Sequence, residues 1–136
     1  QEEVDSEESL CVDGENFRYF ECQDVIGALE NIIEGKSRWM LYDFIKGDGG
    51  YVDIRRFENE DAPAGTYKVE YVRWSEPSPI GYRSVVFDVR LLRKWMWKLI
   101  DDDQLPDPMD EYRQFDVNCY FQKIADKVTT QIRNER

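Results

Sequence analysis

Three carboxylates on neighbouring predicted strands are the first residues whose types could do chemistry: Asp43, Asp53 and Glu70. Two carboxyl groups about 5–10 Å apart can hydrolyse a glycosidic bond, and an acidic cluster that binds divalent cations can cleave a phosphodiester. No spacing among the three is diagnostic of either reaction, and the sequence favours pairing of Asp53 and Glu70 with arginines across a sheet. A carboxylate-based hydrolase or nuclease is therefore the second alternative.

The residue types on which most other catalytic sites depend are absent or unsuitably spaced. The chain has no histidine, which excludes His-based triads, His-ligated zinc and imidazole pH switches. Its three cysteines, Cys11, Cys22 and Cys119, form no C-x-x-C pair, which excludes zinc ribbons and thioredoxin-like redox motifs. Free thiols are expected, although a Cys11–Cys22 bridge stays open for an exported chain. We expect no catalytic residue, no metal and no cofactor.

Two loops have compositions that can bind ions. The segment 46–50 (KGDGG) would cradle a phosphate if it led from a strand into a helix, but it leads into a second strand and predicts a hairpin turn. The acidic segment 101–111 lacks the EF-hand pattern, because Pro106 stands where that pattern needs glycine and Tyr112 where it needs glutamate. Both segments therefore predict structural loops.

The net charge of −11 is concentrated near the N-terminus. Residues 1–35 hold 11 of the 29 acidic residues against one base, Arg18, whereas residues 36–136 are nearly neutral. This charge opposes binding of duplex nucleic acid or of an anionic membrane and favours a protein partner with a basic surface. The acidic residues predicted to contact such a partner are Glu2, Glu3, Asp5, Glu7, Glu8, Asp13, Glu15, Glu21 and Asp24.

A second candidate contact set combines arginines with aromatic rings. The chain has 4 Trp, 8 Tyr and 7 Phe, and exposed Trp and Arg side chains are typical of the energetic centres of protein interfaces. The partner-binding residues predicted on this ground are Arg55, Arg56, Arg73, Trp74 and Trp97. The basic face of a predicted helix is solvated, docks the acidic N-terminal segment or meets an acidic partner; its residues are Arg90, Arg93, Lys94 and Lys98.

The elements that must position these residues follow from hydrophobic periodicity. Helices are predicted, in chain order, at 22–34, at 88–101 after an Asp88 cap, and at 116–133. Strands are predicted at 37–45, 51–57, 66–75 and 82–87. This order predicts an α+β fold with an N-terminal helix, a four-stranded antiparallel meander and two C-terminal helices packed on one face.

Length and composition predict one domain with a tail. Residues 1–16 are expected to be an acidic flexible tail, because they hold too few apolar residues to offset the entropy of ordering. Residues 17–136 are expected to form the single α+β domain. No apolar run approaches the roughly 20 residues of a transmembrane helix. The expected location is the cytoplasm, or outside the cell if a leader was removed before Gln1.

Over residues 17–101, the order of elements, the small size and the acidic charge resemble the bacterial polymorphic-toxin immunity proteins. The resemblance implies stoichiometric binding to a toxin domain, often by blocking a basic nucleic-acid site, and transfers no binding residue. We therefore expect a non-catalytic acidic binding protein that inhibits or neutralises a basic partner. The first alternative is a structural or adaptor subunit of a larger cellular or viral assembly, and the oligomeric state stays open.

Overall fold

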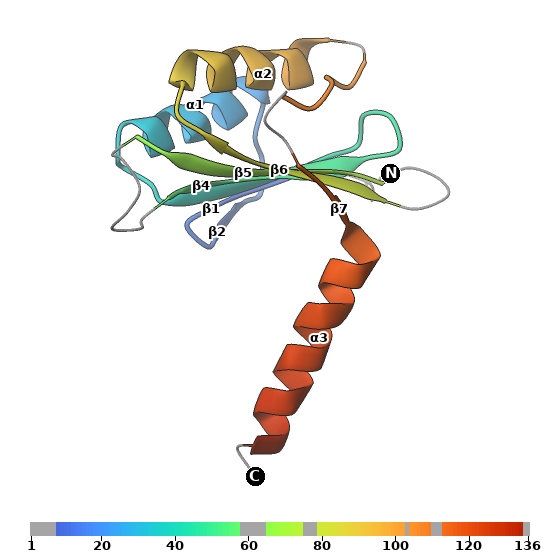
Figure 1. The fold of residues 1–136 in the computed structure, drawn as a ribbon. Coiled ribbons are helices and arrows are strands. Elements are labelled where there is room, and N and C mark those ends of the chain that lie inside the picture. The colour runs from blue at the N-terminus through green and yellow to red at the C-terminus, as the bar shows by residue number, and fades with distance from the viewer. Residues whose placement is uncertain (1–7, 58–64, 75–78, 103, 110–112, 135–136) are drawn as a thin grey trace, which may run out of the picture.

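The structure, a computed structural model, describes residues 8–57, 65–74, 79–102, 104–109 and 113–134. Its elements are, in chain order, β1 (Ser9–Val12), β2 (Glu15–Phe17), α1 (Cys22–Ile33), β3 (Trp39–Phe44), β4 (Gly50–Arg56), β5 (Tyr67–Arg73), β6 (Ile80–Val86), α2 (Val89–Asp101), β7 (Arg113–Asp116) and α3 (Val117–Asn134). The strands form one antiparallel sheet, with α1 and α2 on one side of it and α3 on the other (Figure 1).

The sheet corrects the predicted fold. In the described part of the chain it has seven strands in the order β2-β1-β3-β4-β5-β6-β7, where the sequence predicts four. The predicted meander corresponds to β3–β6, and the helix expected at the N-terminus follows the hairpin β1–β2. The α+β class and the antiparallel pairing are confirmed, but the predicted number and order of elements are wrong.

Residues 9–16 belong to the sheet, although the sequence predicts an acidic tail over 1–16. Leu10 and Val12 alternate with polar residues along β1 and are buried among the core side chains. Their burial offsets the cost of ordering a charged segment. The tail prediction is therefore wrong for residues 9–16, and residues 1–7 of that prediction lie outside the described residues.

The turn between β1 and β2 explains how so acidic a segment reaches the sheet. Asp13 and Gly14 both have positive φ, 52° and 88°, which is the backbone that a two-residue hairpin turn requires. The Asp13 carboxylate accepts hydrogen bonds from the backbone N–H groups of Arg38 (2.9 Å) and Trp39 (3.1 Å) at the start of β3. The turn thus fixes both the hairpin and its attachment to the next strand.

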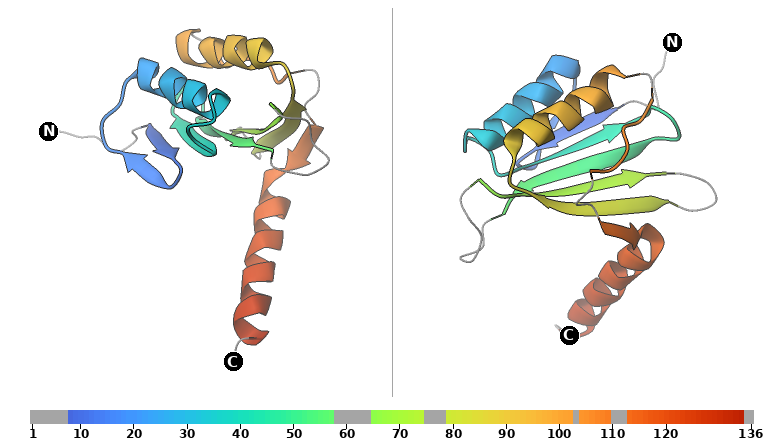
Figure 2. Two further views of the ribbon diagram at one scale, coloured as in Figure 1. Left: turned by 90° about the vertical axis from the view of Figure 1, so that its left-hand side faces the viewer. Right: turned by 45° about the horizontal axis from the view of Figure 1, so that its top comes forward.

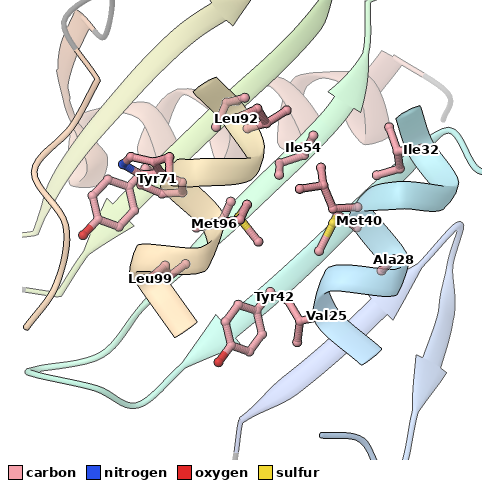
Figure 3. Packing of buried hydrophobic residues seen from close by; sticks show 14 of the residues in the cluster. Val25, Ala28, Ile32, Met40, Tyr42, Ile54, Tyr71, Leu92, Met96 and Leu99 are labelled. Carbon is pink, nitrogen blue, oxygen red and sulfur yellow. The ribbon is translucent and has the colours of Figure 1, made fainter. Parts of the chain in front are cut away.

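The core lies between the sheet and the helix pair α1–α2 (Figure 3). The buried residues of the two helices are Val25, Ala28, Leu29 and Ile32 on α1, and Leu92, Trp95, Met96 and Leu99 on α2. Each set repeats every three or four residues, so it forms one apolar stripe. These stripes pack on the inward side chains of the central strands, among them Met40, Ile54 and Tyr71. The Asp88 carboxylate caps α2 by accepting from the N–H of Arg90 at 2.9 Å.

The glycine-rich segment 46–50 forms the β3–β4 turn, as the sequence predicts. Gly47 and Gly49 have positive φ, 66° and 84°, which glycine adopts without steric cost. Lys46 in this turn reaches the last turn of α2, where its ammonium group donates to the carbonyl oxygens of Leu99 (2.8 Å) and Asp102. A cation at this position satisfies open carbonyls and opposes the negative end of the helix dipole.

Helix α3 does not pack beside α2, so the prediction of two C-terminal helices on one face is wrong. It follows β7 at the edge of the sheet and extends away on the opposite side from α1 and α2 (Figures 1 and 2). Its first residue, Val117, is buried with Tyr51 and Val72. Beyond Val117, the described side chains of α3 are exposed.

Candidate partner-binding surfaces

The second face of the sheet, opposite α1 and α2, holds all three carboxylates that the sequence singles out. Asp53 and Glu70 are register partners on β4 and β5, and Asp43 is the register partner of Tyr51. All three alternate with core residues along their strands, so they share one face. The structure therefore brings Asp43, Asp53 and Glu70 to the same surface.

Each of these carboxylates already accepts hydrogen bonds from a neighbouring side chain. Glu70 accepts from the Tyr51 hydroxyl at 2.5 Å and from Arg83 Nε at 3.0 Å. Asp53 accepts from Arg55 Nε at 2.9 Å and Nη2 at 3.1 Å. The expected pairing with an arginine across the sheet is confirmed for Glu70, which pairs with Arg83 of β6. It is wrong for Asp53, which pairs with Arg55 along its own strand, β4.

Four of the acidic residues predicted to contact a basic partner instead have a structural role: Glu8, Asp13, Glu21 and Asp24. Glu8 accepts from the Tyr42 hydroxyl (2.7 Å) and from the N–H of Ile45 (3.1 Å). Burial, together with the Glu8 carboxylate, raises the pKa of the Tyr42 hydroxyl. Asp13 holds the start of β3, and Glu21 and Asp24 form the reciprocal capping box of α1.

The remaining acidic candidates divide into one exposed residue and four that are not described. Glu15 is exposed on the edge strand β2. Glu2, Glu3, Asp5 and Glu7 lie outside the described residues.

The arginine and tryptophan set is not gathered into one patch. Arg55 lies on the second face, where its guanidinium is 5.3 Å from the centroid of the Trp39 ring, and Arg56 follows it at the end of β4. Arg73 pairs in register with Gly50, at the other end of the same strand pair, and Trp74 follows it. Arg55 and Arg56 thus lie at one end of the β4–β5 pair, whereas Arg73 and Trp74 lie at the other.

The two candidate tryptophans are on different layers. Trp74 packs against the Tyr51 ring, with ring centroids 5.9 Å apart. Trp97 lies on α2, on the side away from the sheet, and is 47% exposed. An interface that uses Trp97 cannot also use Trp74, because the sheet separates them.

The helix layer joins opposite charges. The Arg93 guanidinium of α2 donates two hydrogen bonds of 2.8 Å to the Glu30 carboxylate of α1. These hydrogen bonds lower the pKa of Glu30 and raise the pKa of Arg93. The predicted basic face is thereby divided: Arg93 pairs with α1, whereas Arg90, Lys94 and Lys98 are exposed to solvent.

Helix α3 carries a stripe of apolar side chains that are exposed to solvent. Ile124, Val128 and Ile132 are 42%, 49% and 50% exposed and lie one helical turn apart. The sequence predicts this helix at 116–133 but expects it to pack on the sheet beside the preceding helix. The signal against the core was the second face itself, because charged residues alternate along β4 and β5 and a polar face does not pack an apolar helix.

Within the described residues, no group of three or more Cys, Asp and Glu side chains could hold a metal ion. Cys11 and Cys22 are both free thiols, and the side chain of Cys119 is not among those described. No helix among the described residues has the length and apolarity needed to cross a bilayer. Comparison with protein-family models, curated proteins and solved structures finds no match to this chain.

Proposed function

We propose that this chain is a non-catalytic protein-binding domain, a subunit or adaptor that attaches to its partner through α3. The observation that carries the proposal is the exposed stripe of Ile124, Val128 and Ile132 on a helix that extends away from the sheet. Apolar stripes at this spacing are the side of a helix that docks into a groove. The α+β body then serves to hold α3 and to present it.

Helix α3 needs such a partner on energetic grounds. A helix of 18 residues without tertiary packing is marginally stable in water, and its several β-branched residues lower its helix propensity further. Complete burial of one Ile or Val side chain contributes about 1.5–3 kcal/mol. Three side chains that are only half buried therefore leave roughly 2–4 kcal/mol for a partner to supply.

The charge of α3 defines the chemistry of the groove. Its described charged residues are Lys123, Asp126, Lys127 and Arg133, three bases and one acid. Lys127 lies three residues after Ile124, so it flanks the stripe. We expect an apolar groove with acidic residues along its rim.

The test compares two substitutions on the same helix. Val128→Asp places a charge on the stripe, whereas Thr130→Asp places the same charge on the opposite side of the helix. Both positions are exposed, so both variants should fold. With a stoichiometric partner purified from the native source, we expect Val128→Asp to weaken binding by about tenfold or more and Thr130→Asp to leave it nearly unchanged. Equal binding by both variants would contradict attachment through α3.

A second candidate keeps the inhibitor hypothesis and uses the acidic side of the molecule. Residues 21–34, which contain α1 and its caps, hold four acids and no base. This supports a basic partner, as an immunity protein would have. Because removal of residues 1–16 would also remove β1 from the core, the test uses Glu15→Gln with Glu34→Gln. We expect slower association with the basic partner and a weaker dependence of its rate on salt; unchanged kinetics would contradict this candidate.

A further inference from the structure

The outer surfaces of α1 and α2 lie side by side and carry opposite charge. We call this surface the helix face; its outward residues include Gly27 and Glu30 on α1, the C-cap Glu34, and Arg90, Lys94 and Trp97 on α2. Residues 21–34 contain no base, and neither Lys94 nor Lys98 forms an ion pair with a described residue. A surface divided in this way is complementary to a second copy of itself.

Gly27 is the second observation. It lies in the middle of α1 and is exposed, and a Cβ at this position would meet no atom of another described element within 4 Å. Its φ is not in the left-handed region, so neither conformation nor internal packing requires glycine. Glycine inside a helix costs stability, and its usual benefit is close approach of another group. No described residue of the same chain supplies that group here.

The group that fits is Trp97, and the helix geometry shows why. The helices run antiparallel (Figure 2), and the Glu30–Arg93 ion pair sets their relative position along the axis. Gly27 precedes Glu30 by three residues and Trp97 follows Arg93 by four. Because the helices are antiparallel, both residues are displaced from the ion pair in the same direction along the helix axes. The displacement is about 4.5 Å for Gly27 and about 6 Å for Trp97. Gly27 and Trp97 therefore lie almost level.

We propose that two copies of the chain associate through the helix face. The twofold axis that relates them lies in the interface, parallel to α1 and α2 and above the line midway between them. Rotation about this axis places α2 of one copy over α1 of the other. It does not change the position of any residue along the axis. Trp97 of the second copy then covers Gly27. Arg90 precedes Arg93 by three residues and Glu34 follows Glu30 by four, so they are displaced from the ion pair in the opposite direction, by about 4.5 Å and about 6 Å. Arg90 of the second copy therefore lies near Glu34. Each contact occurs twice.

The size of the helix face sets the expected strength. Helices of 12 and 13 residues are about 18–20 Å long, and neighbouring helix axes are about 8–10 Å apart. Such a face offers several hundred Å² per copy, less than the roughly 800 Å² of a standard interface. We therefore expect a weak dimer that dissociates as salt rises, because its complementary charges are exposed.

The first test is sedimentation velocity on the full chain over about a hundredfold range of concentration, at low and high salt. We expect reversible dimers at low salt. Gly27→Gln fills the space beneath Trp97 yet has a higher helix propensity than glycine. It should raise resistance to urea while raising the dimer dissociation constant by about tenfold or more. A wild-type chain that stays monomeric throughout, or a dimer unaffected by Gly27→Gln, would overturn the proposal.

A charge exchange provides the second test and does not depend on Gly27. Arg90→Glu and Glu34→Arg each replace an attraction by a repulsion across the twofold axis. Each also loses an exposed ion pair within the chain, with Asp88 and with Lys36, but such pairs contribute little and each new charge suits the local helix dipole, so folding should be preserved. Each single variant should weaken the dimer, and the double variant should restore it. Absence of restoration would count against the proposed register. Val128→Asp serves as the control: loss of the dimer in this variant would assign self-association to α3 instead.

Discussion

Arg93 on α2 and Glu30 on α1 form a two-pronged ion pair across 63 residues of sequence, with both N–O distances at 2.8 Å. The pair links the two helices above the core rather than within it, because both side chains stay partly exposed. It fixes the position of one helix along the other, and the levels of Gly27 and Trp97 depend on it.

The ion pair predicts how stability changes with pH. Arg93 holds the pKa of Glu30 below its usual 4.5. A lowered folded-state pKa contributes stability above the unfolded value, and this contribution is lost as pH falls through the folded value. We expect stability to urea to fall between about pH 5 and pH 3, and less steeply in Glu30→Gln. Arg93→Gln should reduce the slope equally; an unchanged slope in both variants would show that the pair makes no such contribution.

Lys46 predicts a local effect at the C-terminus of α2. Lys46→Met removes the ammonium group that bonds the carbonyls of Leu99 and Asp102, and should lower the free energy of unfolding by about 1 kcal/mol. The matched control is Lys36→Met, which removes an exposed surface charge and should change stability by less than about 0.5 kcal/mol. Urea unfolding measures both. Equal effects would mean that Lys46 does not cap the helix.

Two isoleucines separate the core from the α3 stripe. Ile32 on α1 is fully buried, whereas Ile132 on α3 is half exposed. Ile32→Ala should cost about 2–5 kcal/mol, and Ile132→Ala should stay within about 0.5 kcal/mol, because the lost contacts are few and alanine favours helix. If Ile132→Ala proved as costly as Ile32→Ala in urea unfolding, α3 would pack on the body in solution.

Two glycines should respond in opposite directions to alanine. Gly27→Ala at high dilution should raise the free energy of unfolding by about 1 kcal/mol, because the added Cβ meets no other described element. Gly50→Ala should lower it by about 1–3 kcal/mol, because its Cβ would collide with the Val72 carbonyl and the Phe44 ring. The readout is again urea unfolding. A stabilised Gly50→Ala variant would be incompatible with the β4–β5 register.

Local patterns predict the elements that pack locally. Val25, Leu29 and Ile32 repeat at helical spacing, and α1 lies where they predict. Alternation in Tyr67–Arg73 and the glycine turn at 46–50 likewise predict β5 and the β3–β4 hairpin. These features depend on residues close in sequence, which is why a period is enough to find them.

The elements missed depend on partners far along the chain. Leu10 and Val12 are two apolar residues within an acidic segment, and only their pairing with β3 reveals a strand. β7 is four residues long and pairs only with β6. The stripe of α3 has the period of a core helix, and no local feature shows that α1 and α2 already cover the available apolar face.

The sequence predicts the types of the candidate residues better than their positions in the fold. Asp43, Asp53 and Glu70 do share a face, since strand alternation determines it. The acidic set could not be interpreted from charge alone, because hydrogen bonds to backbone groups such as those of Glu8 and Asp13 depend on the three-dimensional approach of β3. The sequence places Gly27 within a predicted helix, but its level with Trp97 of α2 depends on how the two helices pack.

The position of β1 between β2 and β3 determines the order in which this chain can fold. The β3–β4 turn closes a short loop, whereas Ser9 reaches Asp43 across 34 residues, with α1 in between. The longer closure costs more entropy and is slower, so we expect β1 to join the sheet after the β3–β4 hairpin has formed. In pulse-labelled hydrogen exchange, the Val52 amide should become protected before the Leu10 amide; the reverse order would contradict this sequence. During synthesis β1 leaves the ribosome before β3, so it would wait for that later strand before it finds its place.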